Sequence, residues 1–124
     1  MGIEFKIDAG AGIIYAVAIG NIGVKDIESY RKRFLSDPQY RSELNVIADY
    51  RKDRINVTVD EAQQLAIWHK EKKPVNKVAL VMGPDGYGFA RMYQGWLAGS
   101  QDVEVFRDMI SAMEWLGLPS EDDP

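Results

Sequence analysis

The sequence predicts an α/β domain built on a small mixed sheet that is mostly parallel and has one antiparallel edge strand. Apolar runs of strand length alternate with segments of helical periodicity, in the order β-β-α-β-α-β-α-β-α. A short glycine-rich stretch is all that separates the first two runs, which favours a hairpin. Each later strand is reached through a helix, and such crossovers are right-handed and join parallel strands.

Two strands open the chain. Residues 3–8 alternate apolar and polar side chains, as in a half-buried strand at a sheet edge. The turn at residues 9–12 leads to a second, more central strand at residues 12–20. The run Gly20-Asn21-Ile22-Gly23 is expected to end this strand, because glycine and asparagine favour turns.

A helix and a third strand follow. The helix at residues 25–35 stops at Asp37-Pro38, since a proline disfavours helical geometry in the residue before it. We interpret the basic run at residues 31–33 as a solvated face. The third strand, at residues 44–48, ends at Asp49, and a polar loop is expected up to Thr58. In the helix at residues 25–35, the positions that face inward are Ile27, Tyr30 and Phe34.

The second helix begins after Thr58, which has the spacing of a capping box with Glu61, and continues to about residue 72. The fourth strand is the continuous apolar run at residues 78–82, typical of a strand covered on both faces. Residues 83–86 are expected to form a tight turn before the third helix. The buried stripe of this helix is Phe89, Met92, Tyr93, Trp96 and Leu97.

A short strand at residues 103–105 and a helix at residues 107–116 complete the predicted elements. We expect residues 1–118 to form a single domain and residues 119–124 to form an acidic, mobile tail. The inward positions of the last helix are Met109, Ile110, Met113 and Leu116.

Composition argues against several classes of protein. The 124 residues carry a net charge of -4, whereas a general nucleic-acid binder needs clustered excess Lys and Arg. The longest apolar run, residues 13–19, is far shorter than the roughly 20 residues that cross a bilayer. The N-terminus lacks a signal-peptide pattern, and cysteine is absent. We therefore expect a cytoplasmic protein with no membrane span and no nucleic-acid partner.

The sequence also lacks a catalytic motif. The glycines at residues 83–88 do not have the spacing of a dinucleotide or Walker loop. Asp49 ends a strand, as in phospho-acceptor receiver domains, but the neighbouring strand ends lack the acidic cluster and the cation of such a site, which favours a carboxylate that accepts backbone N–H groups. His69 is the only histidine, and we interpret it as a partly buried helix-end residue. We expect no enzyme activity, no cofactor and no metal site.

Two surfaces are candidates for binding. The outer face of the third helix carries Tyr87, Arg91 and Gly95; Tyr and Arg are enriched in interfaces, and small residues permit close approach. The carboxyl ends of parallel strands commonly hold ligands, and Asp49 and Tyr50 lie at this edge with Tyr87 and Arg91 nearby. Because the core residues suffice only to fill the faces of one sheet, we expect a shallow cleft there rather than an internal pocket.

Several segments together resemble the bacterial SpoIIAA-like family, which is grouped with STAS and Sec14-like domains. The matching segments are V-I-A-D at 46–49, K-V-A-L-V at 77–81, Y-G-F-A-R-M-Y at 87–93, V-F-R-D at 105–108 and S-A-M-E-W-L-G at 111–117. The resemblance implies a small mixed sheet flanked by helices, in a family that mostly lacks an assigned function. Sec14-like relatives imply an apolar or lipid-like ligand as a further possibility.

The resemblance also bears on Thr58. The namesake relatives, the anti-sigma factor antagonists, bind a partner kinase and are switched by phosphorylation of a serine in an Asp-Ser-Ser-Gly turn that opens the second helix. The corresponding segment here is Asn56-Val57-Thr58-Val59, in which only a hydroxyl remains. Thr58 is therefore the candidate phosphosite, although helix capping alone explains its presence.

Our leading hypothesis is a non-enzymatic, STAS-like module that acts through protein contacts, including self-association as a homodimer. The alternative is a binding domain for a small anionic or amphipathic, lipid-like ligand at the carboxyl ends of the strands. An enzyme that uses carboxylates near Asp49 and Asp85 is the third and weakest hypothesis.

Overall fold

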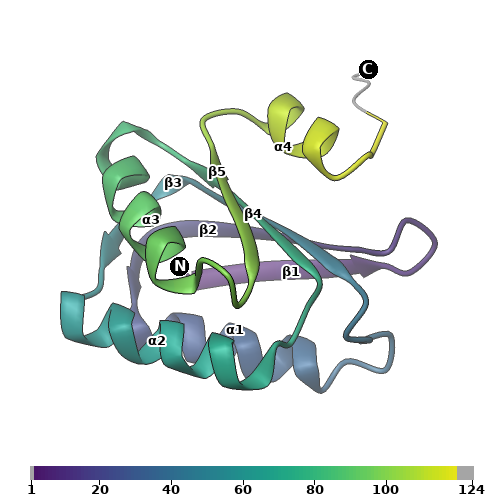
Figure 1. Cartoon of the computed structure of the whole chain (residues 1–124), viewed down its shortest axis with the longest axis horizontal. Helices are drawn as coiled ribbons and strands as arrows, with labels where there is room; N and C mark the ends of the chain where they lie inside the picture. The colour runs from purple at the N-terminus through teal and green to yellow at the C-terminus, as the bar shows by residue number, and fades with distance from the viewer. Residues whose placement is uncertain (1, 120–124) are drawn as a thin grey trace.

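The computed structural model describes residues 2–119, in which five strands form one sheet and four helices pack on it (Figure 1). The predicted order of strands and helices is confirmed. The strands are β1 (Gly2–Asp8), β2 (Ile13–Gly23), β3 (Asn45–Asn56), β4 (Lys77–Met82) and β5 (Asp102–Phe106). The helices are α1 (Val24–Leu35), α2 (Val59–Lys72), α3 (Pro84–Leu97) and α4 (Met109–Trp115).

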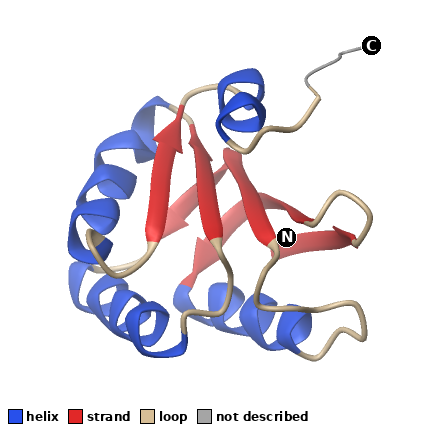
Figure 2. Ribbon diagram, turned by 45° about the vertical axis from the view of Figure 1, so that its right-hand side comes forward, coloured by secondary structure: helices blue, strands red, loops and turns tan. Residues whose placement is uncertain are grey.

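The spatial order of the strands equals their order in the chain, β1-β2-β3-β4-β5. β1 is antiparallel to β2, and every later neighbour is parallel, as predicted. Because the parallel strands are added one after another in one direction, right-handed crossovers place α1, α2 and α3 on the same face of the sheet. The chain then turns back after β5, and α4 covers part of the opposite face (Figure 2).

The two faces of the sheet have separate hydrophobic cores. Successive strand residues point to opposite faces, so Ile13 belongs to the core under α4, whereas Ile14 belongs to the core under α1 and α2. In the same way Ile47 faces α4, whereas Ala48 faces the three-helix layer. Burial on both faces explains the continuous apolar runs in the central strands.

The predicted ends of β2 and β3 were wrong. The run Gly20-Asn21-Ile22-Gly23 continues β2, and the expected polar loop after Asp49 continues β3 to Asn56. The two extensions pair with each other, with Ile22 opposite Ile55, beyond a register irregularity between Val17 and Ile19. Backbone pairing and the full burial of Ile22 stabilise this ribbon, although its sequence is rich in turn-forming and charged residues.

Two further predictions were wrong in detail. The expected tight turn after β4 is the first turn of α3, which begins at Pro84, since proline is tolerated where a helical N–H has no acceptor. Ile110, expected to face inward, is 59% exposed, because the short α4 buries Ala112 and packs through Met109 and Met113. The single-domain expectation for residues 1–118 stays a prediction, and the acidic tail at 119–124 lies outside the described residues except for Pro119.

Candidate functional site

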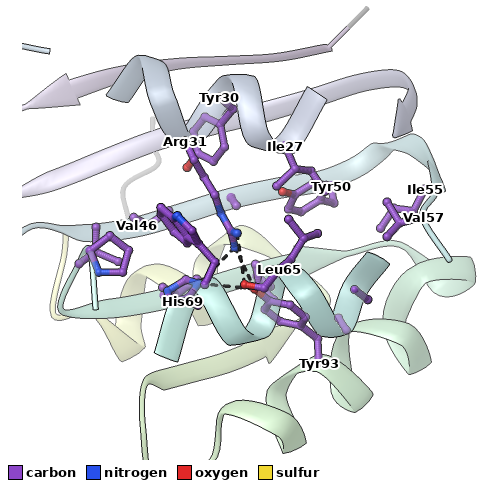
Figure 3. A pocket seen from close by; sticks show the side chains of 18 of the residues that line it. Ile27, Tyr30, Arg31, Val46, Tyr50, Ile55, Val57, Leu65, His69 and Tyr93 are labelled. Atoms are coloured by element: carbon purple, nitrogen blue, oxygen red, sulfur yellow. Dashed lines mark hydrogen bonds between the residues drawn. The ribbon is translucent and has the colours of Figure 1, made fainter. Parts of the chain in front are cut away.

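A cavity that is partly open to solvent lies between the sheet and the layer of helices α1, α2 and α3 (Figure 3). Its volume is about 100 Å³. A cavity beneath the helices differs from the filled core, with a shallow cleft at the strand ends, that the sequence predicts. Strand residues that line it include Val46, Ala48, Tyr50, Val78, Leu80 and Met82, and helix residues include Ile27, Phe34, Leu65, Phe89 and Ala90.

Small side chains on facing elements leave this space open. Ala48 on β3, Ala62 on α2 and Ala90 on α3 all line the cavity and are almost fully buried. Packed protein interiors normally leave few voids larger than a water molecule. Here three alanines from three different elements line one space that larger residues surround.

A polar cluster of Arg31, His69 and Tyr93 lies in the wall of the cavity (Figure 3). Arg31 Nη2 donates to Tyr93 Oη at 2.9 Å and lies 3.3 Å from His69 Nδ1. Arg31 Nη1 donates to the backbone carbonyl of Leu65 at 3.3 Å. One arginine thus joins α1 to both α2 and α3 inside an otherwise apolar layer.

The protonation of His69 follows from these contacts. A guanidinium is only a donor, so Nδ1 must accept and the proton of the neutral ring lies on Nε2. Burial, followed by the positive charge of Arg31, lowers the pKa of His69 to about 3, while the Gln101 side chain opposes this decrease. Nε2 itself is buried without a hydrogen-bond partner among the described residues. His69 is therefore a neutral acceptor toward Arg31 near pH 7.

The Arg31 guanidinium has no carboxylate partner in the part of the chain that the structure describes, where Asp49 with Arg51 is the one ion pair within 4.0 Å. It lies instead 4.3 Å from the centre of the Trp68 ring. A cation–π contact stabilises a cation, but it does not neutralise its charge. The positive charge in the cavity wall therefore has no carboxylate within ion-pair distance among the described residues.

Two tyrosine hydroxyls add polar groups to the lining. Burial raises the pKa of Tyr30 and of Tyr50, so both hydroxyls stay protonated at physiological pH. Neither hydroxyl has a hydrogen-bond partner among the residues described. Both can therefore donate to a molecule in the cavity.

A surface groove runs outside the cavity, between α1 and α2. Its volume is about 560 Å³. Arg31, Leu65 and Trp68 line the groove and also line the cavity, so these three side chains form the partition between them. Movement of the Trp68 and Arg31 side chains would connect the cavity to this groove.

The sequence-predicted site residues lie in three places. Asp49 is paired with Arg51, whose Nε lies 2.9 Å from Oδ1. Burial alone would raise the pKa of Asp49, but hydrogen bonds from Arg51 outweigh this and lower it. Asp49 therefore accepts a backbone N–H, as one interpretation expected, although it does so within a strand. Tyr50 lines the cavity.

The other predicted residues lie on α3. Tyr87 is half-buried, packs with Tyr50 against the core cluster that contains Ala90, and stacks on Arg107 at 3.8 Å. Arg91 and Gly95 are exposed. The structure thus brings Tyr50 and Tyr87 to one cluster, with Arg91 on the outer surface.

Thr58 caps α2 as expected. Its hydroxyl accepts from the Glu61 N–H at 3.1 Å, and the Glu61 carboxylate accepts from the Thr58 N–H at 2.9 Å. Phosphorylation of Thr58 stays a prediction. No group of three or more His, Asp or Glu side chains suited to a metal occurs within residues 2–119.

Sequence reasoning missed Arg31, which it assigned to a solvated basic run. A signal was present, because Ile27, Tyr30, Arg31 and Phe34 occupy positions i, i+3, i+4 and i+7 of a helix. Arg31 therefore falls within the apolar stripe of α1, whereas Lys32 and Arg33 fall outside it and are exposed.

No protein-family model and no curated protein sequence matches this chain. Among solved structures, the chain is similar to an uncharacterised DUF3478-family protein with a SpoIIAA-like fold from Shewanella loihica PV-4. The TM-score is 0.64 at 18% sequence identity, and the alignment covers 93% of this chain and 94% of the other. Among the described helices, none has the length and apolar character that a bilayer crossing requires. The predicted resemblance is therefore confirmed at the level of the fold: this chain has the SpoIIAA-like fold.

Proposed function

We propose that this protein is a binding module that holds a small, mainly apolar molecule in the cavity between the sheet and helices α1 to α3. The observation that carries the proposal is a mainly apolar space lined by a few polar groups, the common composition of small-molecule sites. The sequence offered ligand binding as its alternative function and placed the site at the strand ends. The proposal keeps that function but puts the site in the space beneath the helices. The proposal assigns no catalytic step to the protein.

The size of the cavity limits the ligand. An apolar cavity of about 150 Å³ accommodates a benzene-sized molecule. The volume of about 100 Å³ here is smaller than that, so the ligand is no larger than benzene and a chain of about five carbons is the upper limit. A long-chain lipid would require the helices to move outward.

Access to the cavity is proposed through the seam between α1 and α2. The partition of Arg31, Leu65 and Trp68 is one side chain thick, because the same residues line both spaces. Trp68 is only partly buried, and exposed side chains change rotamer on short timescales.

The test is a titration of the ¹⁵N- and methyl-labelled protein with 1-pentanol, followed by NMR. Saturable shift changes are expected at Ala48 and Ala90, which line the cavity. Ala112, which α4 buries against the opposite face of the sheet, is the internal control and should not respond. The proposal is contradicted if neither 1-pentanol nor pentanoate nor benzene gives saturable changes, or if the changes map only to the surface.

A second candidate is self-association through the outer face of α3, our leading hypothesis from the sequence. Arg91 and Gly95 are exposed there, and a side chain added at Gly95 would meet no atom within 4 Å. Light scattering over a range of protein concentrations tests this role. A dimer that Arg91→Glu weakens at least tenfold supports it, whereas a monomer at every concentration counts against it. A cytoplasmic location stays a prediction.

A further inference from the structure

The hydrogen bonds of Arg31 leave part of its binding capacity unused. A guanidinium has five N–H groups. Three of them point at Leu65 O, Tyr93 Oη and His69 Nδ1, so two remain without an acceptor among the described residues. The three acceptors in use are all neutral, because the pKa of His69 is lowered by burial and by Arg31, and the pKa of Tyr93 is raised by burial.

A partly buried cation without a counter-ion is costly, and such charges in proteins are normally paired. Arg31 is held by contacts from α2 and α3, and the Trp68 ring covers one face of the guanidinium. The side chain is thus fixed in the cavity wall, where a long flexible cation could otherwise turn to solvent. The guanidinium of Arg31 is therefore held in place as a binding group for an anion.

The other residues that line the cavity limit the chemical class of the anion. Tyr30 and Tyr50 contribute neutral hydroxyl donors, and the other cavity residues on the strands are mainly apolar. A guanidinium N–H makes a short, charge-assisted hydrogen bond with a carboxylate oxygen, and one carboxylate balances the single charge of Arg31. A dianionic phosphate would need more than the single cation that lines the cavity.

We propose that the cavity ligand is a small carboxylic acid whose carboxylate is bound by Arg31 and whose apolar part lies against β3, β4 and α3. The proposal rests on the ligand-binding function above and adds the chemical class of the ligand. The carboxylate accepts a hydrogen bond from one of the N–H groups of Arg31 that remain free, and a tail of about four carbons fills the space beside Ala48 and Ala90.

The experiment is calorimetric titration of the full chain with three molecules of five carbons each: pentanoate, 1-pentanol and pentylamine. Pentanoate is expected to bind at least tenfold more tightly than 1-pentanol, and pentylamine more weakly than either. Arg31→Gln should weaken pentanoate at least tenfold and change 1-pentanol by less than threefold. The matched control is Arg33→Gln on the same helix, since Arg33 donates to the Ile3 carbonyl on β1 and does not line the cavity.

Each outcome decides between the two proposals. If 1-pentanol binds as tightly as pentanoate, or if Arg31→Gln leaves the preference intact, the carboxylate proposal is overturned while the cavity proposal stands. If none of the three molecules binds, both are overturned. Should Arg31→Gln fail to fold, ¹³C-carboxyl-labelled pentanoate on the wild-type protein decides instead. Contact with Arg31 should lower the pKa of its bound carboxyl, and an unchanged or raised pKa contradicts the proposal.

Discussion

Filling the cavity at Ala48 should make the protein more stable and weaken ligand binding. Ala48 lies on β3 between Val46 and Tyr50, is 4% exposed and lines the cavity. Ala48→Val adds two methyl groups to a space that is already empty. At about 0.8 kcal/mol for each buried carbon, the upper limit of the gain is about 1.6 kcal/mol.

Part of this gain is offset by imperfect fit, whereas the strand preference of valine adds to it. We therefore expect the free energy of unfolding to rise by about 1 kcal/mol, and the melting temperature to rise by about 4 °C for a chain of this length. Urea unfolding followed by circular dichroism measures the first quantity. The same variant should bind 1-pentanol at least fivefold more weakly, because valine occupies part of the site.

Ala16→Val is the matched control. Ala16 is the register partner of Ala48 on β2, faces the same core and is 2% exposed, but it does not line the cavity. Added methyl groups there meet packed neighbours, and overpacking costs about 1–3 kcal/mol. If Ala48→Val destabilises the protein as much as Ala16→Val, the space beside Ala48 is not available and the reasoning fails.

Three further predictions concern stability. Burial and the charge of Arg31 lower the pKa of His69 to about 3 in the folded protein, against about 6.5 in the unfolded chain. The contribution of His69 to the free energy of unfolding is therefore fully present above pH 6.5 and falls as the pH drops toward 3. The stability advantage of wild type over His69→Gln should shrink by up to about 1.4 kcal/mol per pH unit over that range, and a constant difference would contradict this. Burial, and then the charge of Asp49, raise the pKa of Asp53 to about 6, so its ionisation disfavours the fold as the pH rises through 6. Asp53→Asn should therefore gain stability relative to wild type between pH 4 and pH 7, by about 1 kcal/mol after solvent screening, and no gain would count against the assignment. Thr58→Ala should cost about 1 kcal/mol in urea unfolding, whereas Thr58→Ser should cost little; equal losses would show that the cap hydroxyl is not responsible.

Much of the fold could be predicted because its signals are local. The run at residues 78–82 is apolar at every position, since β4 is covered on both faces. The spacing of Thr58 and Glu61 marked the start of α2 correctly. The order of the elements and the handedness of crossovers were then sufficient for a mostly parallel sheet.

The extensions of β2 and β3 could not be predicted in this way. Asn21 and Arg54 look like loop residues when each is considered in its own segment, and they are stable in strands because they pair with each other. A pairing between residues so far apart in the chain leaves no local pattern.

The cavity was missed for a related reason. Ala48, Ala62 and Ala90 are ordinary small core residues in sequence, and the space they leave depends on the relative placement of β3, α2 and α3. Arg31 was more accessible to prediction, because it falls within the apolar stripe of α1. A single basic residue in an apolar stripe indicates a polar function inside the core.

The most direct test is a crystal structure of the protein soaked with 5-bromopentanoic acid, with diffraction recorded at the bromine absorption edge. We expect one bromine peak inside the cavity near Ala48 and Ala90, and carboxylate density at Arg31. A cavity that stays empty at saturating ligand, or bromine peaks only on the surface, would contradict the proposal that this SpoIIAA-like fold binds a small molecule beneath its helices.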